Sequence, residues 1–206
     1  MGIIIKKYLS PYIEENTYIV TDEATGASAV IDPGILNKEI VDYLADKGID
    51  YILLTHAHGD HIKDIMKYKA KYPDASVAVG CNEKDFLEDS SKNGSVNMPF
   101  GPISLKADIL TDNSTELPLG ESVISFISTP GHTPGSQCIR ICDSLFSGDT
   151  LFFMSVGATH FPGGDWEQLK KSISETLFAL PDEVTVYPGH GPETSIGYEK
   201  RANPFV

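Results

Sequence analysis

The sequence predicts an α/β (α+β) protein with a four-layer αββα architecture, in which two packed β-sheets lie between outer helices. Short β-rich segments bounded by Gly, Pro and Asp recur in both halves of the chain, and each half also contains helical patterns. No linker or low-complexity tract interrupts the 206 residues, a length that suffices for one core. We therefore expect a single domain over residues 1–206.

The N-terminal segments predict strands connected by hairpins. The β pattern covers residues 3–8, 17–21 and 28–31, with a turn at 23–26. Asp32-Pro33-Gly34 ends the last of these strands. Asn37 then caps a predicted helix that Gly48 ends. The apolar face of this helix is expected to comprise Ile40, Val41 and Leu44.

A strand, a polar loop and a helix are predicted next. Residues 51–54 form an entirely apolar strand pattern, and residues 62–72 form the helix that Pro73 closes. A further strand is expected at 76–79 and a helix at 82–88. The stretch 89–102 is rich in Ser, Asn, Gly and Pro and contains Met98 and Phe100, a composition that suits a mobile loop beside a cleft.

The second half of the chain repeats this alternation in a different order. Strands are predicted at residues 107–111, 123–128, 137–141, 145–146 and 184–187, and a closing helix at 193–202. Asp165 and Gln168 form a capping-box pattern at the start of another helix. The buried stripe of that helix is expected to be Trp166, Leu169, Ile173, Leu177 and Leu180.

Charge and composition exclude some classes of function. The formal net charge is −13 and the only arginines are Arg140 and Arg201, so a phosphate-binding face for nucleic acid is not expected. One group of lysines lies beside apolar residues at helical spacing, which predicts the solvent side of a helix. These lysines are Lys63, Lys67, Lys69 and Lys71.

The cysteines and apolar runs predict a cytoplasmic protein. Cys81, Cys138 and Cys142 are odd in number and contain no Cys-x-x-Cys pair, which favours reduced thiols. Cys138 and Cys142 stand at even spacing on a predicted strand and are expected to share a buried face. No apolar run approaches the roughly 20 residues that span a bilayer, so membrane insertion and secretion are not expected.

One short stretch concentrates side chains that bind metals. Residues 55–61 read Thr-His-Ala-His-Gly-Asp-His at the end of an apolar strand pattern. Alternate side chains of an extended segment point the same way, so His56 and His58 can share one side. The chain then turns at Gly59 and sends Asp60 and His61 elsewhere. This arrangement favours two metal ions rather than one.

Three further donors follow later β patterns. His132, Asp149 and His190 each lie in a turn that contains glycine. Five histidines and two aspartates make seven donors, too many for one ion, because a catalytic zinc usually takes three protein ligands and keeps one position open. Three plus three donors with one shared carboxylate fit two ions. A structural zinc is disfavoured because such sites usually include Cys.

The pattern His-x-His-x-Asp-His, followed by single His, Asp and His positions, resembles the metallo-β-lactamase-fold hydrolases. Within them, the chain is most similar to the glyoxalase II (hydroxyacylglutathione hydrolase) enzymes, over nearly its whole length. The similar motifs are Ser-Gly-Asp-Thr-Leu-Phe at 147–152, Phe-Pro-Gly-Gly-Asp at 161–165 and Pro-Gly-His-Gly-Pro at 188–192.

The resemblance implies how the donors divide between the two ions. His56, His58 and His132 would hold one ion, and Asp60, His61 and His190 would hold the other. Asp149 would bridge them. The resemblance also suggests that Asp32 orients a metal-bound imidazole by accepting its hydrogen bond.

The expected chemistry follows from such a pair of ions. Two divalent ions about 3.5–4 Å apart lower the pKa of a bridging water toward neutrality and polarise a carbonyl group. We expect a metal-bridging hydroxide to attack an acyl carbon, with Asp60 as the catalytic residue that holds the proton. Zinc is the expected metal, and His and Asp donors also accept iron and manganese.

The expected substrate is a small acyl thioester. Longer glyoxalase II enzymes carry a C-terminal helical domain that contributes much of the glutathione site, and this chain ends at Val206. Short relatives tend to read Gly-Arg-Thr-Asp where this chain has Gly-Ala-Thr-His at 157–160, so no arginine clamp for glutathione carboxylates is evident. We therefore expect a smaller or different thiol. His160 has no assigned role.

Other functions remain open. A sulfur dioxygenase of the same fold, with a single iron, would consume oxygen with a persulfide. A lactone or β-lactam hydrolase would apply the metal chemistry to a cyclic acyl group. A protein that only binds metal would hold the ions without an exchangeable water. The sequence indicates nothing about the oligomeric state.

Overall fold

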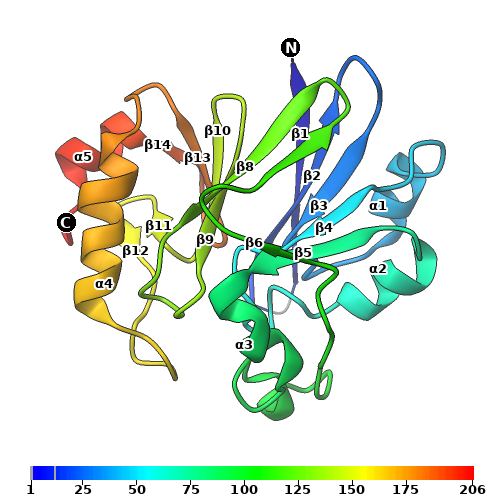
Figure 1. The fold of residues 1–206 in the computed structure, drawn as a ribbon, viewed down its shortest axis with the longest axis horizontal. Coiled ribbons are helices and arrows are strands. Elements are labelled where there is room, and N and C mark those ends of the chain that lie inside the picture. Colours follow the sequence, from blue (N-terminus) through cyan, green and yellow to red (C-terminus); the bar gives the residue numbers. More distant parts are fainter. Residues whose placement is uncertain (1, 12) are drawn as a thin grey trace.

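The computed structural model describes residues 2–11 and 13–206 and confirms the αββα architecture (Figure 1). The first sheet has six strands, which are hydrogen-bonded in their order along the chain. They are β1 (Ile3–Leu9), β2 (Asn16–Asp22), β3 (Ser28–Ile31), β4 (Tyr51–Leu53), β5 (Ser76–Gly80) and β6 (Ile109–Thr111). β1 to β3 pair antiparallel, and β3 to β6 pair parallel.

The second sheet also has six strands, in the order β14-β13-β10-β9-β8-β7. Its neighbours pair antiparallel, except that β10 and β13 are parallel. The strands are β7 (Glu116–Leu119), β8 (Ser122–Ser128), β9 (Gln137–Ile141), β10 (Ser144–Gly148), β13 (Thr185–Pro188) and β14 (Thr194–Ser195). A separate pair consists of β11 (Leu151–Phe152) and β12 (Ser155–Val156).

Helices cover the outer face of each sheet. In Figure 1, α1 and α2 lie beyond the first sheet, and α4 and α5 lie on the opposite side of the molecule. The helices are α1 (Lys38–Tyr43), α2 (Ile65–Lys71), α3 (Lys84–Glu88), α4 (Trp166–Lys171) and α5 (Ile196–Ala202). The short helical turns are η1 (Cys81–Glu83), η2 (Ser95–Asn97), the π turn η3 (Ser172–Thr176) and η4 (Leu177–Ala179).

Alternation of side chains along the strands produces the four layers. Ile19, Val30 and Ile52 point from the first sheet into the core beneath its helices. Their neighbours Val20 and Ile31 point the other way, into the core between the sheets. A third cluster lies between the second sheet and its helices. Two-sided burial of the strands therefore explains why both sheets need helices over them.

The predicted caps are confirmed at two helix starts. The Asn37 side chain accepts a hydrogen bond from the Ile40 amide at 2.9 Å and begins α1. The Asp165 carboxylate accepts one from the Gln168 amide at 3.0 Å and begins α4. Each cap satisfies a backbone donor that the first helical turn leaves without a partner.

Two expectations about burial are wrong. Trp166 is 38% exposed, whereas Leu169, Ile173 and Leu177 are buried as predicted. Helical spacing gives the direction of a side chain but not whether another layer extends beneath it. Cys142 is also exposed, because β9 ends one residue earlier and Cys142 takes a φ of 54° in the turn before β10. Cys138 is buried as expected.

Some elements were not predicted. β7, β11, β12 and β14 are strands of two to four residues, and their side chains lack a long alternating pattern. The predicted start of the helix at residue 62 is also early, since α2 begins at Ile65. Over residues 2–11 and 13–206, none of the helices has the length and apolarity needed to cross a bilayer.

Candidate metal centre

The predicted donors lie in loops that leave the two sheets at one rim. His56 to His61 follow β4 in the first sheet. Asp149 directly follows β10 in the second sheet, and His190 follows β13. His132 lies in the loop between β8 and β9. The structure therefore brings together side chains that are up to 134 residues apart in the sequence, from His56 to His190.

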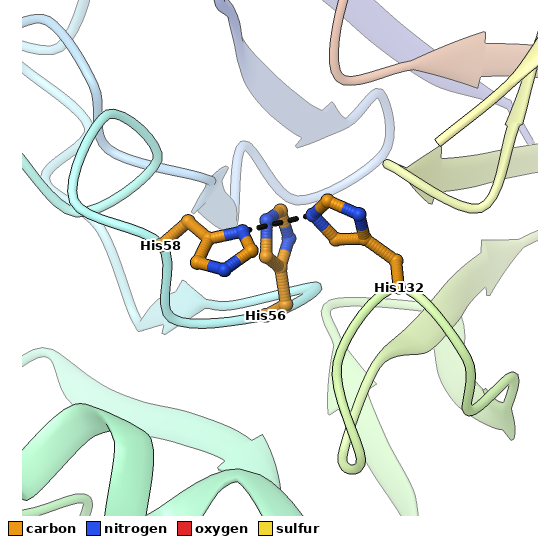
Figure 2. A group of neighbouring side chains, drawn as sticks. All are labelled: His56, His58 and His132. Atoms are coloured by element: carbon orange, nitrogen blue, oxygen red, sulfur yellow. Dashed lines mark hydrogen bonds between the residues drawn. The ribbon is translucent and has the colours of Figure 1, made fainter. Parts of the chain in front are cut away.

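His56, His58 and His132 form the first group of donors (Figure 2). Figure 2 shows the three rings turned toward one another, two from the β4 loop and one from the β8–β9 loop. The Nδ1 atom of His58 lies 2.8 Å from the Nε2 atom of His132. One nitrogen from each ring lies within 4.8 Å of the others, so a single ion can contact all three.

Asp60, His61 and His190 form the second group. The Nε2 atom of His190 lies 3.5 Å from Asp60 Oδ2, and the Nε2 atom of His61 lies 3.9 Å from the same oxygen. Asp149 stands between the two groups. Its carboxylate oxygens are 3.3 Å from His61 Nε2 and 3.5 Å from His132 Nε2.

Several buried atoms at this site have no hydrogen-bond partner among the residues that the structure describes. They are His56 Nε2, His61 Nε2 and Asp149 Oδ1. A buried polar atom without a partner destabilises the fold by about 1–3 kcal/mol, so three in one place require an explanation. Imidazole nitrogen and carboxylate oxygen are donors that divalent metals prefer. The site therefore fits a metal ion in chemistry as well as in spacing.

The hydrogen-bond network assigns the proton positions of the histidines. The Nδ1 atom of His61 donates to Asp32 Oδ2 at 2.9 Å. The Nδ1 atom of His56 donates to Thr55 Oγ1 at 3.1 Å, and the Thr55 hydroxyl donates to the same Asp32 oxygen at 2.6 Å. When each ring carries a single proton, on Nδ1, its Nε2 atom is free to bind a metal ion.

Asp32 is thus placed where the resemblance suggested, and it acts on two histidines rather than one. It is 2% exposed and has a φ of 49°, directly after β3. Its second oxygen, Oδ1, accepts the Thr55 amide at 2.8 Å. His132 is oriented differently, because its Nδ1 atom donates to the carbonyl of Ala158 at 2.7 Å.

One glycine makes the close approach of the two sheets possible. A Cβ atom at Gly148, which has a φ of +49°, would lie 2.2 Å from Thr55 Oγ1. Any side chain there would push the Asp149 loop away from the loop that carries His56. The Ser-Gly-Asp motif therefore has a packing reason at this position.

Burial and neighbouring charges shift the pKa values of these donors. Burial, together with the surrounding imidazoles, lowers the pKa of His56 well below its ordinary value and that of His58 to about 4. Burial opposes the charged form of His61 as well, but Asp149, Asp60 and Asp32 raise its pKa well above the ordinary value. Burial also disfavours the Asp149 carboxylate, and the imidazoles of His61 and His132 nevertheless lower its pKa. Neutral His56 and His58 beside an ionised Asp149 are in the protonation states that metal binding needs.

A cavity of about 500 Å³ opens over the donors. Its floor is formed by His58, Asp60, His132, Asp149 and His190. One wall is formed by Ser91, Lys92, Asn93, Gly94, Asn97 and Met98, and another by Ile13, Phe161 and Pro162. The polar stretch 89–102 therefore lies beside a cleft, as its composition predicted.

Hydrogen bonds hold the 91–98 wall against the donor loop. The Gly59 amide donates to the Asn93 carbonyl at 2.9 Å. The buried Asn93 side chain donates to the carbonyls of Phe86 and Ile103. A Cβ atom at Gly59 would lie 3.2 Å from Ser95, so the two segments are in close contact. The position of the wall is thus tied to that of the donors.

His160 is not part of the donor set. It is exposed, and its ring packs 4.2 Å from that of Phe161. His160 is not one of the described residues that line the cavity. One residue that contacts both donor loops, Glu83, was not singled out from the sequence. It is fully buried in η1, and a lone glutamate in a helical pattern carries no signal of its own.

Comparison with protein-family models matches residues 13–190 to the metallo-beta-lactamase superfamily. The probable metallo-hydrolase YqgX of Bacillus subtilis (strain 168) is 38% identical over 94% of this chain and 93% of its own length. The hydroxyacylglutathione hydrolase GloC of Haemophilus influenzae is 34% identical over 94% of this chain and 93% of its own length.

Solved structures agree with the fold. The crystal structure of BLEG-1 B3 metallo-beta-lactamase has a TM-score of 0.89 and 35% sequence identity, and the match covers 98% of this chain and 99% of that one. TTHA1623, solved in a di-iron-bound form, has a TM-score of 0.84 and 29% identity, covering 98% of this chain and 100% of that one.

Proposed function

Because this chain belongs to the metallo-beta-lactamase superfamily and has the fold of its metal-dependent hydrolases, we propose that it hydrolyses a small acyl thioester at a binuclear metal centre. The observation that carries this proposal is the convergence of seven His and Asp donors, five of which line one cavity, with three of their buried atoms lacking a hydrogen bond among the described residues. The similarity to a hydroxyacylglutathione hydrolase supports the thioester substrate class.

The geometry supports one division of the donors. His56, His58 and His132 would hold the first ion. Asp60, His61 and His190 would hold the second. Asp149 faces both groups and would be shared between them. We propose zinc as the metal. Nitrogen and oxygen donors also accept iron and manganese, and the likeness to a di-iron protein supports testing iron.

When bound, two divalent ions supply Lewis acidity that lowers the pKa of a coordinated water and polarises an acyl carbonyl. The residues of the chain orient and surround this chemistry. Asp32 and Thr55 fix the rings of His61 and His56 with their Nε2 lone pairs toward the site. Asp60 lines the cavity, and we assign to it the role of holding the proton of the attacking water.

The ionised form of Asp60 suits this role. Burial opposes ionisation of its carboxyl group, but His61 and His190 lower its pKa. The carboxylate is therefore available as an acceptor at neutral pH. Asp60 Oδ2 also lies 3.5 Å from the Nε2 atom of His190, and this contact helps to hold the carboxylate in place.

The walls of the cavity suit a compact substrate of mixed polarity. Phe161, Pro162 and Met98 offer apolar surface for an acyl or thiol chain, and the 91–98 wall offers hydroxyl and amide groups. Lys92 is the one Lys or Arg among the described residues that line the cavity. Glutathione carries two carboxylates, so a thiol with fewer charges is the better match.

The test combines metal analysis with a substrate panel. Purified protein is expected to bind two equivalents of metal and to hydrolyse thioesters in preference to lactones, β-lactams and persulfides. A His58→Ala variant should lose metal and activity, while His160→Ala, an exposed histidine outside the cavity, should keep both. Full activity and full metal content in His58→Ala would refute the proposed centre.

The similarity to a B3 metallo-beta-lactamase favours a second candidate, hydrolysis of a β-lactam. The same donors would serve a cyclic acyl group, so the two candidates differ only in substrate. Faster turnover of a β-lactam than of every thioester in the panel would select this candidate. Oxygen uptake with a persulfide, and no hydrolysis of either class, would instead indicate a sulfur dioxygenase.

A further inference from the structure

Glu83 is a buried carboxylate that lies behind the first group of donors. It ends η1, directly after β5, and is fully buried. Burial raises the pKa of its carboxyl group to about 7, despite hydrogen bonds that favour the charged form. A carboxylate in such an environment destabilises the fold unless its hydrogen bonds offset the loss of water.

All three hydrogen bonds of Glu83 come from the two loops that carry the first donors. Its Oε1 atom accepts the Ala57 amide at 2.9 Å, and Ala57 lies between His56 and His58. Its Oε2 atom accepts the Thr133 hydroxyl at 2.8 Å and the Gly135 amide at 3.0 Å. Thr133 directly follows His132. One carboxylate therefore joins the loop of the first sheet to the loop of the second.

Glu83 and the loop that carries His132 are in close backbone contact. A Cβ atom at Gly135 would lie 2.1 Å from the Glu83 backbone nitrogen, so only glycine permits this approach. The Thr133 hydroxyl also lies 2.6 Å from the Ser136 hydroxyl, which accepts the Thr133 amide at 3.1 Å. The loop that carries His132 is thus closed on itself and fastened to Glu83.

We propose that Glu83 is a positioning residue that sets the distance of His56 and His58 from His132, and thereby the affinity for the ion that these three histidines hold. This inference rests on the proposed binuclear site. Donors that the folded protein already holds in place bind an ion more tightly, because little conformational entropy remains to be lost on binding. Within the loop after β4, Glu83 bonds only at Ala57, between two ligands of the first ion, and among the described residues its side chain makes no hydrogen bond to the loop of His190, so we expect the second ion not to depend on it.

Glu199 provides a matched control. It is also fully buried and accepts hydrogen bonds from three groups, namely the Thr194 hydroxyl, the Met154 amide and the Asn203 side-chain amide. These contacts fasten α5, and none of them involves a donor loop. Replacing either glutamate by glutamine turns one acceptor into a donor that faces another donor, so both variants carry the same chemical change.

The experiment titrates metal-free protein with Zn²⁺ against a chromophoric chelator, for wild type, Glu83→Gln and Glu199→Gln. Glu83→Gln should weaken one of the two equivalents by about ten- to a hundredfold, as loss of a residue that orients ligands does, and should leave the other unchanged. The weakened equivalent should be the one that His132→Ala removes. Glu199→Gln should leave both equivalents unchanged, whatever its effect on the melting temperature.

Several outcomes would overturn the inference. They are unchanged binding in Glu83→Gln, equal weakening of both equivalents, or the same weakening in Glu199→Gln. If Glu83→Gln does not fold, Thr133→Val removes one of the three hydrogen bonds and should weaken the same equivalent to a smaller extent. Wild-type protein that binds fewer than two equivalents would instead overturn the proposed binuclear centre, and this inference with it.

Discussion

Replacement of Asp32 by asparagine should weaken metal binding without removing any donor. Asp32 Oδ2 accepts hydrogen bonds from His61 Nδ1 and from the Thr55 hydroxyl, and Oδ1 accepts the Thr55 amide. Asparagine keeps the shape but has a donating NH₂ group in place of one oxygen. With its oxygen on the Thr55 amide, the NH₂ group faces His61 and the Thr55 hydroxyl. Both of these must then accept instead of donating.

That reversal reaches the metal donors through the rings. A His61 ring that accepts at Nδ1 carries its proton on Nε2, and the same holds for His56 once the Thr55 hydroxyl donates to its Nδ1. One histidine in each donor group would thus present a proton where a lone pair is required. The opposite asparagine rotamer sets the NH₂ group against the Thr55 amide, which leaves a buried donor unsatisfied and destabilises the fold by about 1–3 kcal/mol.

The expected loss of affinity is about ten- to a hundredfold for each of the two equivalents, or about 1.4–2.7 kcal/mol. It is measured by competitive Zn²⁺ titration of metal-free protein. Asp64→Asn is the control, because Asp64 is buried and accepts the Leu36 amide at 2.8 Å but contacts no imidazole. Asp32→Asn that binds both equivalents as tightly as wild type would refute the assigned proton positions.

Further predictions concern stability, charge and substrate. The melting temperature should fall as metal is removed, in proportion to the logarithm of the free metal concentration, because metal that binds only the folded state stabilises it. Burial raises the pKa of Glu83 from 4.5 to about 7, so the folded metal-free protein holds a proton that the unfolded chain releases. The contribution of Glu83 to the free energy of unfolding should therefore fall as pH rises from about 4.5 to 7, by on the order of 3 kcal/mol. Because buried histidines titrate in the same range with the opposite sign, this fall is measured as the difference between denaturant titrations of wild type and Glu83→Gln. Lys92→Gln should raise the KM for thioesters that carry a carboxylate and leave that for neutral ones unchanged, while Lys84→Gln, which removes the same charge from an exposed position outside the cavity, should alter neither.

The fold was predictable because its strands repeat with a clear period. Ile19 and Val20 point to different cores, and the same alternation recurs along each long strand. The prediction fails where a strand is too short to show alternation, or where no neighbouring layer covers a side chain. β14 has two residues, too few to show alternation, and Trp166 lies on the correct helical face without a layer to cover it.

The sequence predicted the donors of the candidate site but not most of the residues that orient them. His56, His58 and His61 are close in sequence, so their type and spacing are visible without a structure. That these residues bind metal stays a prediction. The residues that orient them come from distant segments, since Glu83 meets Thr133 from 50 positions away and Asp32 meets His61 from 29. A single glutamate or aspartate in a turn has many roles, and only the folded chain shows which one applies.

The two carboxylates support the proposed centre in different ways. Asp32 determines which ring nitrogen carries the proton, whereas Glu83 determines how far apart the two loops stand. Among the described residues, this arrangement leaves buried atoms of His56, His61 and Asp149 without a hydrogen bond, and it keeps two acidic side chains away from water. Apolar residues of similar volume would make a more stable rim. A cation bound between the donors would stabilise a site of this kind, so the proposed metal centre predicts that the protein gains stability when metal is added.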